Sequence, residues 1–202
     1  IDIENEILDK KPEPHLAESA IKTISIVNKN EVLVIGTKEL SKDESDSIKS
    51  DIDNYFKKFN INVNFKYVRY NTEKELLNNF FKLTTKMPVM TGWNFVNYDW
   101  VFLVNRARKL GLEPEVSYQT NILRPNYDPE KYAELPAHRI IVDYMELYEK
   151  WDTKVKVKES SSLDFVSDKL LGITKINYEG NLKILYRDDY KKFVYYNAVD
   201  SI

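Results

Sequence analysis

The sequence contains no cysteine, and its only histidines are His15 and His138. Without cysteine there can be no disulfide framework, which favours an intracellular setting. No apolar run approaches the length of about 20 residues that a membrane-spanning helix needs, and no signal peptide is visible. The chain also has no internal repeat and no low-complexity linker. These absences indicate an intracellular domain without a membrane partner, in the host cytoplasm if the protein is viral.

A large excess of positive charge is missing too, because the formal net charge is −2. That balance argues against a protein that grips duplex DNA along a broad basic face. It does not exclude a nuclease whose acidic site is neutralised by metal ions. Hydrophobic residues make up 43% of the 202 residues and charged residues 31%, which is ordinary for one globular domain with a sizeable core.

Hydrophobic periodicity predicts a group of strands followed by alternating strands and helices. Strands are expected at 1–5, 21–27, 31–35, 62–70, 87–90 and 139–142. Helices are expected at 41–60, after the capping box Thr72–Glu75, at 98–110 with Gly111 as its stop, at 143–148, from Ser161 to Gly172, and from Tyr190 onward. Segment 113–137 is expected to be an irregular insertion, 153–158 a polar edge strand or loop, and 178–181 a turn. This order suggests an α/β fold with a mixed central sheet and helices on both faces.

Residues 91–99 read Thr-Gly-Trp-Asn-Phe-Val-Asn-Tyr-Asp and lie where an expected strand gives way to an expected helix. This is a usual place for a site in an α/β fold. Asp99 falls in the first helical turn, where the helix dipole and free backbone N–H groups favour a carboxylate. Taken alone, Asp99 is either a helix cap or a site residue.

Acidic residues also lie near both ends of the chain. On a strand, Asp2 and Glu4 point to one face while Ile3 points to the other. On a helix, Tyr196 and Asp200 are four residues apart and share a face. If these carboxylates and Asp99 converge, their repulsion raises the pKa of at least one of them unless cations lie between them. Hard oxygen ligands of this kind suit Mg²⁺ or Mn²⁺.

In chain order, the motifs Asp-x-Glu, Asn-x-x-x-Tyr-Asp and Tyr-x-x-x-Asp resemble the three exonuclease motifs of family B DNA polymerases. Relatives often carry an aromatic residue beside the DNA strand at the position of Lys11, so this chain departs from them there. The resemblance covers nearly the whole chain and is weakest at 36–62 and 112–138. Further similarity to the family, and to its T-even-type bacteriophage branch, lies in Pro12-Glu13-Pro14, 71–77, 91–94, 143–148 and 162–167.

The resemblance implies a ribonuclease-H-like fold and a proofreading 3′→5′ exonuclease of the type with four acidic residues and a tyrosine. Two divalent cations, Mg²⁺ or Mn²⁺, would support hydrolysis of the 3′-terminal phosphodiester, with release of nucleoside monophosphates. By resemblance, Asp2, Glu4 and Asp200 hold the ion that activates water. Asp2 bridges to the second ion, which Asp99 holds largely through water. Tyr196 would orient the attacking water.

Related nucleases use histidine to orient that water, but neither histidine of this chain lies near Asp200 in the sequence. The tyrosine variant is therefore favoured, and both histidines are expected in loops or on the surface. Asn94 and the backbone around Phe95 would contact the terminal nucleotide. The side chain of Phe95 could equally belong to the core.

The first interpretation is a single exonuclease domain over residues 1–202, excised from a longer DNA polymerase. Its expected partners are a single-stranded DNA 3′ end, the polymerase domain of the same chain and, through that missing part, a sliding clamp. Two alternatives stay open. One is a nuclease of the same superfamily that acts on RNA or short oligonucleotides. The other is a catalytically silent scaffold domain, which the four intact carboxylates disfavour.

Overall fold

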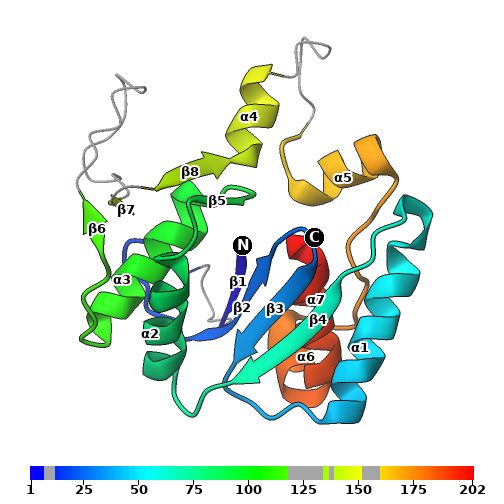
Figure 1. Cartoon of the computed structure of the whole chain (residues 1–202), viewed down its shortest axis with the longest axis horizontal. Coiled ribbons are helices and arrows are strands. Elements are labelled where there is room, and N and C mark those ends of the chain that lie inside the picture. The colour runs from blue at the N-terminus through cyan, green and yellow to red at the C-terminus, as the bar shows by residue number, and fades with distance from the viewer. Residues whose placement is uncertain (7–11, 118–133, 137–138, 152–159) are drawn as a thin grey trace.

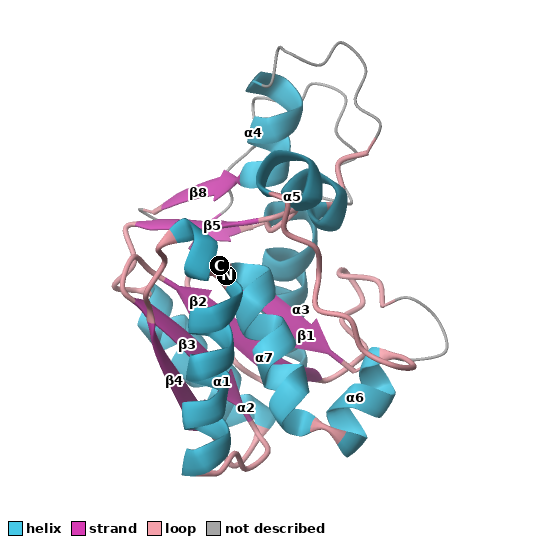
Figure 2. Cartoon of the chain, turned by 90° about the vertical axis from the view of Figure 1, so that its right-hand side faces the viewer, coloured by secondary structure: helices cyan, strands magenta, loops and turns pink. Residues whose placement is uncertain are grey.

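The computed structural model describes residues 1–6, 12–117, 134–136, 139–151 and 160–202. Within this part of the chain, a mixed β-sheet lies between two groups of helices (Figures 1 and 2). The α/β class with helices on both faces of a central sheet is thus confirmed. Every helix in the described ranges is too short or too polar to cross a bilayer. The predictions for Lys11, His138 and 153–158 fall outside the described residues.

The central sheet has four strands in the order β1–β2–β3–β4. Its first three strands are antiparallel, whereas β4 runs parallel to β3. Strands β5 and β8 pair in parallel as a second sheet. The Ile1 ammonium donates a hydrogen bond to the Thr91 carbonyl at 2.8 Å, so β5 lies beside the start of β1. The strands are β1 (Asp2–Asn5), β2 (Ile21–Val27), β3 (Glu31–Gly36), β4 (Asn64–Arg69), β5 (Val89–Gly92) and β8 (Ile140–Asp143).

Helices α2 and α3 cover one face of the sheet, and α1, α6 and α7 cover the other (Figure 1). Helices α4 and α5 lie near the end of the sheet where β1 begins (Figure 2). The helices are α1 (Lys42–Tyr55), α2 (Glu73–Thr84), α3 (Val101–Lys109), α4 (Tyr144–Trp151), α5 (Leu163–Leu171), α6 (Leu182–Asp188) and α7 (Tyr190–Ser201).

Strand alternation divides the core between the two faces. Ile3 and Ile24 join Phe80 and Phe102 under α2 and α3, where all four side chains are buried. Val32 and Val34, from the opposite face of β3, pack with residues of α1 and α7. Each such side chain contributes about 1.5–3 kcal/mol through burial, so the core holds α7 against the sheet and the helices α2 and α3 against the face of β1 that carries Ile3.

Helix α1 ends earlier than the periodicity over 41–60 predicts. After Phe56 the chain enters a short 3₁₀ turn (Lys57–Phe59), and Asn60 adopts a left-handed φ of 57° that ends it. The predicted capping box of α2 forms only in part. Thr72 accepts the Glu75 N–H, but the Glu75 carboxylate accepts the N–H of Asn71 instead of Thr72.

Two local predictions are wrong, and one helix is absent from the predictions. Part of the segment expected to be irregular forms a short antiparallel ladder, β6 (Val116–Ser117) with β7 (Leu135–Pro136), whose partners are too far apart in sequence to be paired by pattern. Helix α6 follows the predicted turn at 178–181; with seven residues it is too short for periodicity to reveal. Ser162, not Ser161, caps α5, while Gly172 ends that helix as predicted with a φ of 61°.

Candidate metal centre

Strand β1 presents two carboxylates to the face that α7 covers. Asp2 lies opposite Ser25 of β2, and Glu4 lies opposite Thr23, whereas Ile3 points into the other half of the core. This is the alternation predicted from Asp-x-Glu, and it follows from the two-residue repeat of a strand. Glu4 is only 9% exposed, so its carboxylate faces the protein interior.

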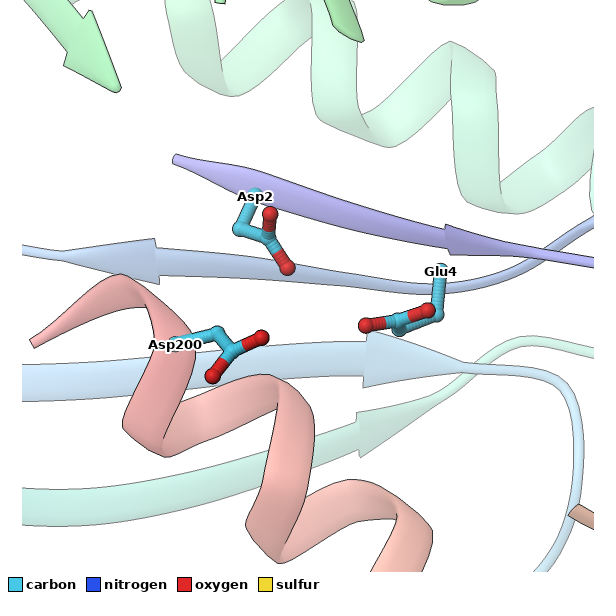
Figure 3. A group of neighbouring side chains, drawn as sticks. All are labelled: Asp2, Glu4 and Asp200. Atoms are coloured by element: carbon cyan, nitrogen blue, oxygen red, sulfur yellow. The ribbon is translucent and has the colours of Figure 1, made fainter. Parts of the chain in front are cut away.

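Helix α7 brings the third carboxylate to the same place. One oxygen each of Asp2, Glu4 and Asp200 lies within 4.8 Å of the others. Figure 3 shows the two β1 side chains and the α7 side chain pointing toward one another. Asn197, one helical turn before Asp200 and fully buried, donates from Nδ2 to Asp2 Oδ2 at 2.7 Å. The two ends of the chain therefore form one site.

Asp99 lies beside this group but is not one of its three members. The central stretch leaves β5 and enters a π-helical turn (Val96–Trp100) before α3 begins. Asp99 sits in that turn with 5% exposure, and its Oδ1 accepts the Ile3 N–H at 3.2 Å. It is therefore more than a helix cap, because its carboxylate binds the strand that carries Asp2 and Glu4.

Burial and crowding shift the pKa values of these acids. Burial, reinforced by the charge of Asp200, raises the pKa of Asp2 to about 7. Burial and then Asp2 hold the pKa values of Glu4 and Asp99 well above their usual range. Desolvation penalises the ionised carboxylates, and each neighbouring carboxylate adds repulsion that the Ile1 and Lys175 ammonium groups only partly offset. The site is therefore electrostatically unfavourable with all its acids ionised and no added cation.

Lys175 is a site residue that no sequence motif indicated. Its Nζ donates to Asp200 Oδ2 at 2.6 Å and to the Tyr196 hydroxyl at 3.1 Å. Its backbone N–H donates to Asp164 of α5 at 2.8 Å, which holds the connecting segment in place. Burial lowers the pKa of Lys175, but Asp200 and the other nearby acids outweigh this and leave it raised. Its contacts are made through tertiary structure, so periodicity could not have revealed it.

Tyr196 is 6% exposed and lies on the same face of α7 as Asp200, as its spacing predicted. Burial and the Asp200 charge raise the pKa of its phenol, so the hydroxyl stays protonated.

The ring of Phe95 is fully buried and packs against Trp100. Its side chain therefore belongs to the core, which was one of the two possibilities for it. Asn94 is half-buried with a left-handed φ of 56°, and His15 is exposed in its loop.

The donor set of the site fits a hard divalent cation. Three carboxylate oxygens converge, and such ligands suit Mg²⁺ or Mn²⁺. The raised pKa values of Asp2 and Glu4 are those of acids that a nearby cation would stabilise in the ionised form. The Asn197 Oδ1 atom is buried without a hydrogen-bond partner among the described residues. The site therefore contains a hydrogen-bond acceptor that no described protein group satisfies.

Comparison with known proteins finds relatives of one family. A family model described as DNA polymerase family B, exonuclease domain, matches residues 1–165, which include Asp2, Glu4 and Asp99 but not Tyr196 or Asp200. The DNA-directed DNA polymerase of Escherichia phage RB69 is 27% identical over 143 residues, which is 66% of this chain and 16% of that protein. DNA polymerase 1 of Saccharolobus solfataricus is 30% identical over 134 residues, 66% of this chain and 14% of that protein. The aligned region is thus about a sixth of the length of these relatives.

Proposed function

Because the chain belongs to the exonuclease domains of family B DNA polymerases, we propose that it hydrolyses the 3′-terminal phosphodiester of DNA as a proofreading nuclease. We also assign it the ribonuclease-H-like fold. One observation carries the proposal: carboxylates from the first strand and the last helix, 195 or more residues apart, converge within 4.8 Å. Such convergence has no structural benefit of its own, because like charges repel and burial penalises them.

The four acids would hold two divalent cations. Asp2, Glu4 and Asp200 would bind one, and Asp2 with Asp99 the other, in keeping with the place of Asp99 beside β1. When bound, two such ions stabilise the attacking and leaving oxygens of an in-line phosphodiester displacement. Mg²⁺ and Mn²⁺ both prefer oxygen ligands, so the donor set does not choose between them.

The other polar side chains of the site would orient the attacking water and the acids or offset the negative charge. Tyr196 offers a protonated hydroxyl next to Asp200 and so can hydrogen-bond to the attacking water. The Lys175 ammonium binds both of these side chains and offsets part of the repulsion among the acids. Asn197 fixes the rotamer of Asp2 through its bond to Oδ2. Asn94 and the backbone around Phe95 stay our candidates for contact with the terminal nucleotide.

We propose a single-stranded or frayed DNA 3′ end as the substrate. A base must leave its stack before its phosphodiester can reach a buried site, at a cost of a few kcal/mol. With a net charge of −2, the chain lacks the broad basic surface that would compensate for melting a duplex. The relatives named above are DNA polymerases, so a polymerase domain in the same protein and a sliding clamp are proposed partners only.

The test is cleavage of 3′-labelled single-stranded DNA and RNA, with and without Mg²⁺ or Mn²⁺. Wild type should release mononucleotides from DNA in a metal-dependent way. Asp200→Ala should abolish release, because it removes a shared ligand, and Asp46→Asn, a change of an exposed aspartate in α1, should leave it intact. Preferential cleavage of RNA would favour the alternative substrate, and metal-independent or absent cleavage would refute the proposal.

A further inference from the structure

The turn that leads into Asp99 is held by a carboxylate from the neighbouring strand. In the parallel β5–β8 pair, Asp143 lies opposite Gly92, the last residue of β5. Asp143 is 6% exposed. Its Oδ1 accepts the Asn94 N–H at 3.0 Å, and its Oδ2 accepts the Val96 N–H at 3.1 Å. One buried side chain therefore binds two backbone donors of the segment between β5 and the π-helical turn.

The same carboxylate also binds the start of α4. Oδ1 accepts the N–H of Met145 at 3.0 Å, next to the bond from Asn94. A carboxylate offers about four acceptor sites, so three backbone donors can share Asp143 without competing. Hydrogen bonds to an ionised acceptor are shorter and stronger than neutral ones. Capping of α4 accounts for one of these three bonds, but not for the two to the turn.

The turn needs such support because its backbone is constrained. Asn94 has a φ of 56°, a left-handed conformation that is uncommon for residues other than glycine, although asparagine tolerates it better than most. At Gly92 a β-carbon would lie 2.5 Å from the Ile1 carbonyl oxygen and 3.0 Å from the Phe95 β-carbon. Surrounding structure must therefore stabilise the path of residues 92–95, and the two bonds from Asp143 act directly on it.

The path of this turn determines where Asp99 lies. The Tyr98 N–H donates to the Asn94 carbonyl at 3.0 Å, and the Trp100 N–H donates to the Phe95 carbonyl at 2.8 Å, five residues back. The second bond has the spacing of a π-helix. The two bonds fix the residues on either side of Asp99, whose carboxylate accepts the Ile3 N–H of β1. Single π-helical turns of this type are frequently found at functional sites.

We propose that Asp143 is a positioning residue of this site: it holds Asn94 and Val96 so that the π-helical turn delivers Asp99 to β1. The structural part stands on hydrogen bonds alone, whereas its kinetic consequence rests on the proposed exonuclease function. Asp143 is not one of the three converging carboxylates, so its effect on hydrolysis passes through the segment that it binds, which carries Asn94 and leads to Asp99.

The test replaces Asp143 and follows both the position of Asp99 and the reaction. Asp143→Asn keeps the shape but leaves one acceptor oxygen, and its amide group must face a backbone N–H. Asp143→Ser is the second variant, in case the first does not fold. The matched control is Glu73→Gln, because Glu73 is also a poorly exposed carboxylate that accepts a backbone N–H, from Ile21 at 2.7 Å. Its other partner is Arg106 of α3, so none of its bonds goes to residues 92–100.

Amide hydrogen exchange of Ile3 reports the position of Asp99 without any need for activity, because that N–H binds Asp99 Oδ1. In the Asp143 variants we expect exchange at Ile3, Asn94 and Val96 to be at least about tenfold faster. A displacement of about 1 Å can cost about 100-fold in rate, so kcat for 3′-end cleavage at saturating Mn²⁺ should fall between about tenfold and 100-fold. The KM for DNA reports separately on Asn94 and the backbone around Phe95, our candidate contacts to the terminal nucleotide, because Asp143 binds that segment too. Glu73→Gln should change neither Ile3 exchange nor kcat.

Wild-type Ile3 exchange or wild-type kcat in a folded Asp143 variant would overturn the inference. An equal loss in Glu73→Gln would overturn it too, because the effect would then be general destabilisation. If the wild-type chain shows no metal-dependent cleavage, the proposed function fails instead. Exchange at Ile3 then decides the positioning role by itself.

Discussion

Asp2→Asn should make the metal-free protein more stable while it abolishes catalysis. The ionised Asp2 carboxylate is held close to Asp200 and Glu4 in a poorly hydrated site. The amide introduced at position 2 has no charge, yet its oxygen can still accept the Asn197 Nδ2–H bond that Asp2 receives. The substitution therefore removes repulsion and desolvation without leaving the Asn197 donor unpaired.

The size of this effect follows from the pKa. The pKa of Asp2 rises from 3.8 to about 7 through burial and then through Asp200. About 3 pKa units at about 1.36 kcal/mol each give a ceiling of about 4 kcal/mol, and relaxation of the site around the charge lowers it. The sign follows from proton binding: between pH 3.8 and about 7 the folded state binds more protons than the unfolded state. The free energy of unfolding of wild type therefore falls as pH rises through this window.

Urea unfolding of both proteins in EDTA measures this directly. Near pH 4 the two should unfold alike, whereas above about pH 8 the Asp2→Asn variant should be more stable by about 2–4 kcal/mol. Asp46→Asn, at an exposed position of α1, serves as the matched charge control. Mn²⁺ at about 100 times its Kd should then stabilise wild type by about 2.7 kcal/mol and the variant by much less. Equal stability of both proteins above pH 8 would refute the electrostatic account of this site.

Three further outcomes are expected. Tyr196→Phe should lower kcat by about 10- to 100-fold, because losing one hydrogen bond of a charged site costs about 1.5–3 kcal/mol; wild-type rates across pH and Mn²⁺ concentration would make Tyr196 a packing residue. Lys175→Met should lower kcat by at least about tenfold. The Mn²⁺ concentration that gives half of the maximal rate should also fall, because the competing ammonium beside Asp200 is gone; an unchanged concentration would contradict this. A mismatched 3′ end should be cleaved faster than a paired blunt end, and comparable rates would count against a single-stranded substrate.

Sequence alone determined the local parts of this protein. Asp2 and Glu4 face one side of β1 because strand side chains alternate, and Tyr196 shares a face with Asp200 because they are four residues apart on a helix. Neighbouring residues also dictate the Gly172 helix stop, the strands over 21–27 and 31–35 and the place of Asp99 between strand and helix, so the sequence predicts these features. The ordered motifs implied that the acids converge, although no local pattern could show it.

Tertiary structure alone decided which other side chains complete the site. Lys175 meets Asp200 from 25 residues away, Asp143 binds Asn94 from 49 residues away, and Asn197 binds Asp2 across 195 residues. Periodicity reports contacts within a few residues along the chain, so it carries no information about partners brought together by the packing of α7 on the sheet or by the pairing of β8 with β5. The π-helical turn before α3 was also hidden, because its path depends on hydrogen bonds to Asp143 and Ile3, which lie outside the stretch that forms it.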